Sequence, residues 1–244
     1  MSATRADVCA VANADLFLTD GEILVSPMGT MPMIGARLAR LTTAPDILLS
    51  DGEAFLLAET PPLGGTSPIE GWIPYRMVFD VVAAGTRHVI MGANQIDRFG
   101  NQNISCFGPH DKPTRQMFGV RGGPGNTVNH RTSYWVPKHS SRVFVETVDM
   151  VSGVGYDRAV GSAGTFHDLH RVVTNLAVLD FGGPKRTMRL VSVHPGVEVD
   201  EVVANTGFPL DISDVAVTRL PTEEELRLLD VLDPRGFRGK EVPS

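Results

Sequence analysis

The N-terminal part of the chain alternates helix-like and strand-like hydrophobic patterns. Apolar residues three or four apart, from Val8 to Leu16, would share one face of a helix that Thr4 can cap. In chain order the pattern predicts a helix ending before residue 21, a strand over 22–26, a helix over 31–42, a strand over 46–50, a helix over 75–84 and a strand over 88–91. Strand–helix–strand alternation at this short spacing predicts parallel strands with helices packed on the sheet.

The C-terminal half shows a different pattern. Its β-rich stretches are separated by Gly or Pro and cover residues 134–136, 142–148, 171–181 and 188–193. A short helix is expected over 199–204. Thr222 and Glu225 have the spacing of a capping box that opens a last helix, and Pro234 ends it. This half is therefore expected to be a mixed or antiparallel sheet with few helices.

Between the halves, residues 91–129 are rich in Gly, Asn and Gln and poor in aliphatic side chains. We interpret this segment as a run of turns that presents polar groups rather than burying a core. Two glycine stretches, 92–97 and 119–126, follow the apolar runs 89–91 and 117–118, which we interpret as buried strands. Glycines placed after a strand let backbone N–H groups approach a phosphate or a developing oxyanion closely. The alternative is that these glycines only make tight turns.

Composition and charge narrow the class of protein. The net charge is −6 and the Lys and Arg residues are scattered, which argues against a nucleic-acid or anionic-membrane surface. Cys9 and Cys106 are too few for a disulfide framework or a zinc site. No stretch approaches the roughly 20 apolar residues of a membrane span. Asp7 and Asp15 stand where a signal peptide would be apolar. We expect a soluble cytoplasmic protein.

Several titratable residues are candidates for chemistry. Asp51 and Glu53 flank Gly52 at the end of a predicted strand, where they could serve as nucleophile or base, or simply be solvated turn carboxylates. Arg121 lies between glycines and could bind an anion or form a structural salt bridge. Asp97 is expected to pair with Arg98 at the surface. Trp72 is a candidate exposed anchor. His167 and His170 are three residues apart without nearby acids in a ligand pattern, so no metal site is predicted. No Walker, G-x-S-x-G or G-x-G-x-x-G motif occurs.

A set of motifs in a fixed order resembles the β-type subunits of class I coenzyme A transferases. The motifs, which span most of the chain, are the stretches 38–49, 92–97 (GANQID), 100–103 (GNQN), 119–126, 194–197 (HPGV) and 220–226 (LPTEEEL). The resemblance implies an α/β fold, an open sheet with helices on both faces and a β-rich C-terminal half, in a single domain over residues 1–244. It also implies a separate α-type partner chain, an α2β2 heterotetramer, an active site shared between the two subunits, and no cofactor besides the coenzyme A of the substrate.

More narrowly, the stretches 119–122 (GVRG) and 51–53 (DGE) resemble the B-type subunits of hydrolases that cleave rings in steroid (cholesterol) breakdown. Family members that transfer CoA carry a nucleophilic Glu in a Glu-Asn-Gly or Glu-Ser-Gly motif after the second strand. Here either Asp51 replaces that Glu one methylene short, or Glu53 follows two positions late. A placement error of about 1 Å can cost on the order of 100-fold in rate.

The hypothesis favoured by this departure is hydrolysis of a ring C–C bond in an alicyclic β-keto CoA thioester. In the resembling enzymes the key Glu belongs to the α-type partner. This chain would then supply Arg121 and the amides of Gly122 and Gly123 near the developing charge. The side chains and backbone expected to line the substrate are those of Gly92, Asn94, Gln95 and Asn126. Two alternatives stay open: a true CoA transferase that uses Asp51 or Glu53, and a non-catalytic scaffold subunit.

Overall fold

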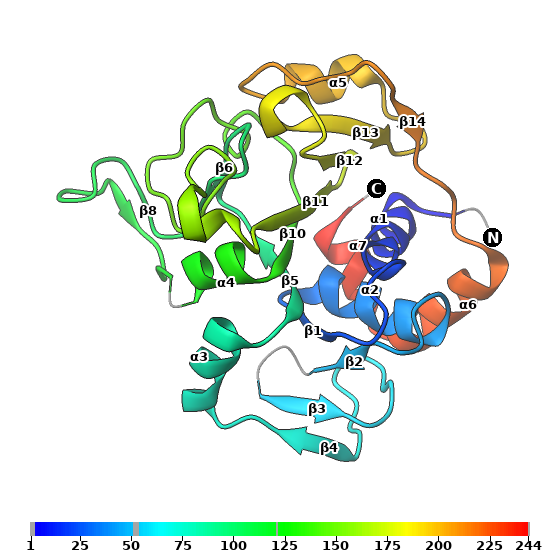
Figure 1. Cartoon of the computed structure of the whole chain (residues 1–244). Helices are drawn as coiled ribbons and strands as arrows, with labels where there is room; N and C mark the ends of the chain where they lie inside the picture. Colours follow the sequence, from blue (N-terminus) through cyan, green and yellow to red (C-terminus); the bar gives the residue numbers. More distant parts are fainter. Residues whose placement is uncertain (1–2, 51–53, 121, 244) are drawn as a thin grey trace.

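A computed structural model describes residues 3–50, 54–120 and 122–243 of the chain (Figure 1). Its centre is an eight-stranded mixed sheet in the order β14-β13-β12-β11-β10-β5-β1-β2. The strands are β1 (Leu24–Pro27), β2 (Leu48–Leu49), β5 (Arg87–Gly92), β10 (Arg131–Val136), β11 (Asp168–Thr174), β12 (Ala177–Asp180), β13 (Arg189–Val193) and β14 (Ala216–Val217). The five strands from β2 to β11 are parallel, whereas β12 is antiparallel to both of its neighbours. The predicted α/β fold with an open sheet is confirmed.

Four helices pack around one apolar core on one face of the sheet: α1 (Arg5–Ala14), α2 (Thr30–Leu41), α6 (Glu223–Leu232) and α7 (Phe237–Glu241). Both predicted caps are confirmed, because Thr4 forms a capping box with Asp7 and Thr222 forms one with Glu225. Helices α1 and α2 approach closely at Gly35, where an added Cβ would lie 2.6 Å from the Cβ of Asn13. The glycine therefore sets the distance between these two helices.

The other face is covered by short helices and irregular chain around a second core. The elements on this side or beside it are α3 (Tyr75–Ala84), α4 (Gly123–Asn129), α5 (Val199–Ala204), and the two-stranded pairs β3 (Phe55–Leu57) with β4 (Ile69–Trp72), β6 (Gln95–Ile96) with β7 (Gln102–Asn103), and β8 (Cys106–Phe107) with β9 (Arg115–Gln116). Three 3-10 turns complete the fold: η1 (Asp15–Phe17), η2 (Gly161–Gly164) and η3 (Pro184–Arg186). The helices predicted over 75–84 and 199–204 are confirmed.

Two strand predictions are wrong. Residues 142–148 form turns, with one isolated bridge between Phe144 and Ile96. The apolar residues of that stretch are present because Phe144 fills the second core, stacked 3.9 Å from the ring of His139. Residues 117–118 are not a buried strand either, since β9 ends at Gln116 and Phe118 is fully exposed. The stretch 171–181 divides into β11 and β12, which form a hairpin.

The polar segment 91–129 also differs from its interpretation as a surface of turns. Asp97, Asn101 and Asn103 are buried, and they hydrogen-bond inside the chain. Asp97 accepts hydrogen bonds from the backbone N–H groups of Phe99 and Asn101 and from the Asn101 amide, at 2.9–3.0 Å. It is therefore not a surface partner of Arg98, which pairs with Glu146 instead. The buried side chains of Asp97, Asn101 and Asn103 thus form a hydrogen-bonded polar interior in a segment that has few aliphatic side chains.

Candidate active site

The two glycine stretches meet at the carboxyl end of β5. The Asn94 amide nitrogen lies 2.7 Å from the sulfur of Met117, which joins the first stretch to the segment that precedes the second. The Asn126 amide nitrogen lies 3.4 Å from the sulfur of Met91, so the helix that follows the second stretch also contacts the end of β5. The structure thus brings together the two stretches that the sequence singled out, at an edge where open α/β sheets bind ligands.

The glycines of the second stretch differ in the space around them. An added Cβ at Gly123 would lie 2.4 Å from a Val120 methyl and 2.8 Å from the Ser152 carbonyl oxygen. At Gly122 the nearest atoms would be 3.7–3.8 Å away, on Val82 and Asn126, which is ordinary contact. Gly119 has a φ of 80°, which favours glycine. Close packing thus requires a glycine at 123, and the backbone conformation favours one at 119.

The residues predicted to line the substrate fall into two groups. Gly92 and Asn94 are exposed at the edge of the sheet, and Gly122 is half-buried. Gln95 is buried, and its amide is bonded within the chain to Asn103 and Asp149 at 2.7–3.1 Å. The Asn126 amide is likewise buried, against Arg87 and Met91. The side chains of Gln95 and Asn126 therefore point into the protein, where they hold the turns in place, and they do not face a substrate.

The three predicted catalytic residues, Asp51, Glu53 and Arg121, lie outside the described residues. The positions that flank the first two are described. Ser50 is buried and donates a hydrogen bond of 2.8 Å to the Val25 carbonyl oxygen of β1. In the sheet, β1 separates β2, which Ser50 directly follows, from β5, the strand that ends at Gly92.

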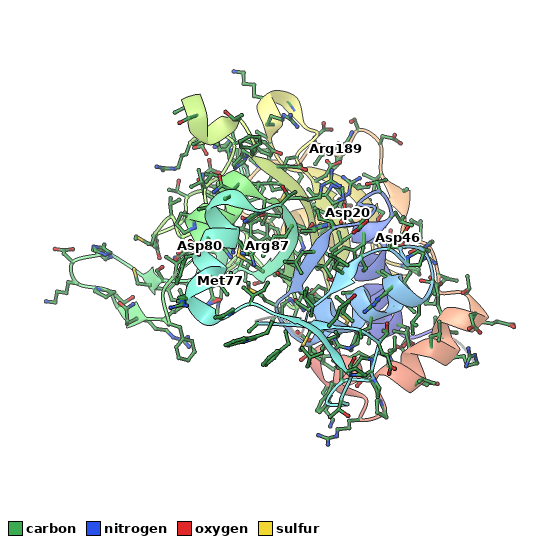
Figure 2. All side chains as sticks on the ribbon, turned by 60° about the horizontal axis from the view of Figure 1, so that its bottom comes forward. Asp20, Asp46, Met77, Asp80, Arg87 and Arg189 are labelled. Atoms are coloured by element: carbon green, nitrogen blue, oxygen red, sulfur yellow. The ribbon has the colours of Figure 1, made fainter. Side chains whose placement is uncertain are left out.

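Arg87 is a buried charged residue that the sequence analysis missed. It opens β5 and lines a small cavity together with Ser26, Ser50, Ala54 and residues of α3. In Figure 2, Arg87 lies beside α3, the helix that carries Met77 and Asp80. The available signal was strand periodicity, since Arg87 alternates in phase with Val89 and Met91 and so points to the same buried face.

A second charged cluster has the composition of a nucleophilic triad. The His88 ring contacts Asp20 at 2.5 Å through Nδ1 and Ser133 Oγ at 2.9 Å through Nε2. Burial raises the pKa of Asp20, but the hydrogen bonds from His88 and Arg131 outweigh it and hold this pKa below its usual value. His88 and Ser133 are both 0% exposed, so no substrate reaches the hydroxyl. The cluster stabilises the packing of β5, β10 and the N-terminal region.

The described ranges contain neither a cluster of metal ligands nor a helix that could span a membrane. No three His, Cys, Asp or Glu side chains in this part of the chain are grouped as metal ligands. His167 instead contacts the Val154 carbonyl oxygen at 2.8 Å. Burial lowers the pKa of His170 to about 4. Within the same ranges, every helix is too short or too polar to cross a bilayer.

Comparison with known proteins defines first the class and then the family. A chain of glutaconate coenzyme A-transferase from Acidaminococcus fermentans superposes with a TM-score of 0.79 over 96% of both chains at 24% identity, which shows a shared fold. The IpdB subunit of the cholesterol ring-cleaving hydrolase of Rhodococcus jostii is 64% identical over 98% of this chain and 96% of the relative. The crystal structure of IpdAB from the RHA1 strain of that species contains a chain that superposes with a TM-score of 0.96 at 62% identity, over the full length of both. No model of a known protein family matches the chain. The chain belongs to the family of IpdB subunits, within the class I CoA-transferase fold.

Proposed function

We propose that this chain is the β subunit of a hydrolase that opens the ring of an alicyclic β-keto CoA thioester in steroid breakdown. The observation that carries the proposal is the 64% identity, over nearly the whole of both chains, to the B subunit of a cholesterol ring-cleaving hydrolase. Coenzyme A takes part as a portion of the substrate, and the proposed reaction needs no further cofactor. We also propose that the enzyme works in the cytoplasm.

The proposed chemistry adds water across a C–C bond. A base removes a proton from water, and the hydroxide oxygen attacks the ring ketone that lies β to the thioester carbonyl. The bond between the former ketone carbon and the α carbon then breaks, and its electron pair forms an enolate stabilised by the thioester. A proton adds to the α carbon. The products are a carboxylate at one end and an intact CoA thioester at the other, in one open chain.

The predicted residues other than Gln95 and Asn126 have direct roles in this proposal. Arg121 and the amides of Gly122 and Gly123 stabilise the charge that develops on the oxyanion and enolate. Gly92 and Asn94, exposed at the end of β5, contact the substrate. The base that activates water comes from the α-type partner. Asp51 and Glu53 orient water or substrate without forming a covalent adduct.

An apolar surface on β4 and α3 supports the shared site. Ile69, Trp72 and Met77 are exposed there, with Trp72 at 64%, which agrees with its prediction as an exposed anchor. Exposed large apolar side chains of this kind are typical of protein–protein interfaces. We propose that the α-type subunit covers this surface and that two such pairs form an α2β2 heterotetramer. Size-exclusion chromatography with light scattering on the co-expressed complex measures that stoichiometry.

The experiment that tests the function is co-expression with the α-type chain, purification of the complex, and incubation with a β-keto CoA thioester. Mass spectrometry should show a product heavier by one water that retains CoA. The chain alone should turn over poorly, because half of the site is missing. Full turnover by the purified single chain would contradict the shared site.

The same assay tests the alternative of a CoA transferase. With a free carboxylic acid present as acceptor, a transferase would move CoA to that acid, and the hydrolase would leave CoA on the ring-opened product. Arg121→Met tests the scaffold alternative. If the complex assembles normally and keeps full activity with this substitution and with Gly123→Ala, the chain contributes no catalytic group.

A further inference from the structure

The guanidinium of Arg87 is buried among neutral partners. Only 6% of the residue is exposed. One terminal nitrogen donates a hydrogen bond of 3.1 Å to Ser26 Oγ, the other donates to Asn126 Oδ1, and Nε has no partner. None of the carboxylates in the described part of the chain forms a salt bridge with it. Burying a cation without a counter-charge costs folding free energy, which suggests that Arg87 has a function besides stabilising the fold.

Arg87 is charged at neutral pH, whereas the neighbouring His130 is neutral. Burial lowers the pKa of Arg87 to about 10, which leaves the side chain protonated at neutral pH. Burial, and then the charge of Arg87, lower the pKa of the neighbouring His130 to about 4, so His130 is neutral. Among the described residues, the surroundings of Arg87 therefore carry one net positive charge, with little solvent to screen it.

The charge is connected to the glycine turns through one side chain. Asn126 accepts from Arg87 with its oxygen, and its nitrogen faces the sulfur of Met91 next to Gly92. A Cβ at Gly122 would lie 3.8 Å from both amide atoms of Asn126. The backbone N–H of Asn126 also donates to the Gly122 carbonyl oxygen at 2.8 Å. Arg87 and Gly122 thus both contact Asn126, which links the buried charge to the turn.

We propose that Arg87 is a positioning residue of the hydrolase site: its charge, which no carboxylate of the described residues pairs and which Asn126 and Ser26 hold in place, raises the electrostatic potential at the Gly92 and Gly122 turns. The inference rests on the proposed function. Arg87 does not touch the substrate. It favours the negative charge that develops at the turns above it, as fixed charges do in preorganised sites. The neutral Asn126 is required, since a carboxylate there would cancel the charge.

The test is Asn126→Asp in the complex with the α-type subunit. This substitution keeps the side-chain shape and gives Arg87 a counter-charge within hydrogen-bonding distance. We expect Tm to stay equal or rise, because a buried ion pair replaces an unpaired cation. We expect kcat to fall by about tenfold or more, with KM changed less than threefold, because charge stabilisation is lost only in the transition state. A purely structural Arg87 would leave kcat unchanged.

Two further variants complete the design. Asn205→Asp makes the same change at the end of α5, outside the site, and should leave kcat as in the wild type. Its Tm should fall slightly, because the donor to the Glu201 carbonyl oxygen is lost and a negative charge is placed at a helix C-terminus. If Asn126→Asp fails to assemble, Arg87→Lys, which keeps the charge, should retain several times the kcat of Arg87→Met. Equal losses in that pair, or a kcat of Asn126→Asp within about twofold of wild type, would overturn the proposal. A wild-type complex that does not hydrolyse the thioester would instead refute the proposed function.

Discussion

Gly123→Ala tests whether the close backbone contact between the first residue of α4 and Ser152 sets the geometry of the site. The added methyl would lie 2.8 Å from the Ser152 carbonyl oxygen and 2.4 Å from a Val120 methyl. The Val120 side chain can rotate away, but the carbonyl belongs to the backbone. To reach an ordinary contact of about 3.4 Å, the two segments must separate by about 0.6 Å, since 3.4 − 2.8 = 0.6.

The expected cost follows from that displacement. Overpacking of this kind typically destabilises a fold by about 1–3 kcal/mol. For a domain of this size, that lowers Tm by roughly 2–12 °C, at about 2–4 °C per kcal/mol. A shift approaching 1 Å in a group that stabilises charge costs up to about 100-fold in rate, so we expect kcat to fall by about tenfold to 100-fold.

The assay compares Tm by calorimetry and kcat by product formation in purified complexes. Gly122→Ala is the matched control for stability, because its methyl meets only ordinary contacts at 3.7–3.8 Å and its φ of −104° suits alanine. Its Tm should stay within about 1 °C of wild type. Wild-type Tm and kcat in Gly123→Ala would refute the reasoning that backbone contact at this glycine holds the turn in place.

Three more outcomes are expected. Replacing Arg121 by Met should lower kcat about 100-fold to 1,000-fold with little change in KM, and Lys at this position should restore only part of the lost kcat. Steady-state kinetics on the intact complex measure both effects. A kcat within about threefold of wild type would remove Arg121 from the mechanism. Hydroxylamine or borohydride trapping during turnover should leave Asp51 and Glu53 unmodified, whereas an adduct on either would favour the transferase. The free energy of unfolding should fall as pH drops from 6.5 toward 4. Burial lowers the pKa of His139 to about 3 and that of His194 to about 4, so the unfolded chain binds more protons than the folded chain in this window. Urea titrations at pH 7, 5.5 and 4.5 measure this change, and a flat profile would contradict the burial of neutral imidazoles.

The elements that local sequence determines were predicted well. Thr4 and Thr222 each begin a helix through contacts within three residues, so their capping boxes can be identified from spacing alone. The strand 88–91 also follows from a local apolar run. Phe144 shows the limit of such reasoning, because its apolar neighbourhood reads as a strand and serves to fill a gap beside His139.

The sequence predicted which turns form the site, but not which of their side chains face the substrate. Glycine clusters marked both turns, and the structure places them together, although only the first begins at the end of a buried strand. Whether a side chain faces the substrate or the interior depends on contacts distant in sequence, which is why Gln95 and Asn126 were expected at the surface of the site and lie beneath it. Arg87 was missed for the same reason, since its partners Ser26 and Asn126 are 61 and 39 residues away.

The central claim is that water, and not a CoA acceptor, opens the ring at a site shared with the α-type subunit. Turnover of the β-keto CoA thioester by the complex in water labelled with oxygen-18 tests it most directly. The account predicts one labelled oxygen in the new carboxylate, none in the thioester carbonyl, and CoA still attached to the product. An unlabelled carboxylate, or CoA released or moved to another acid, would contradict it.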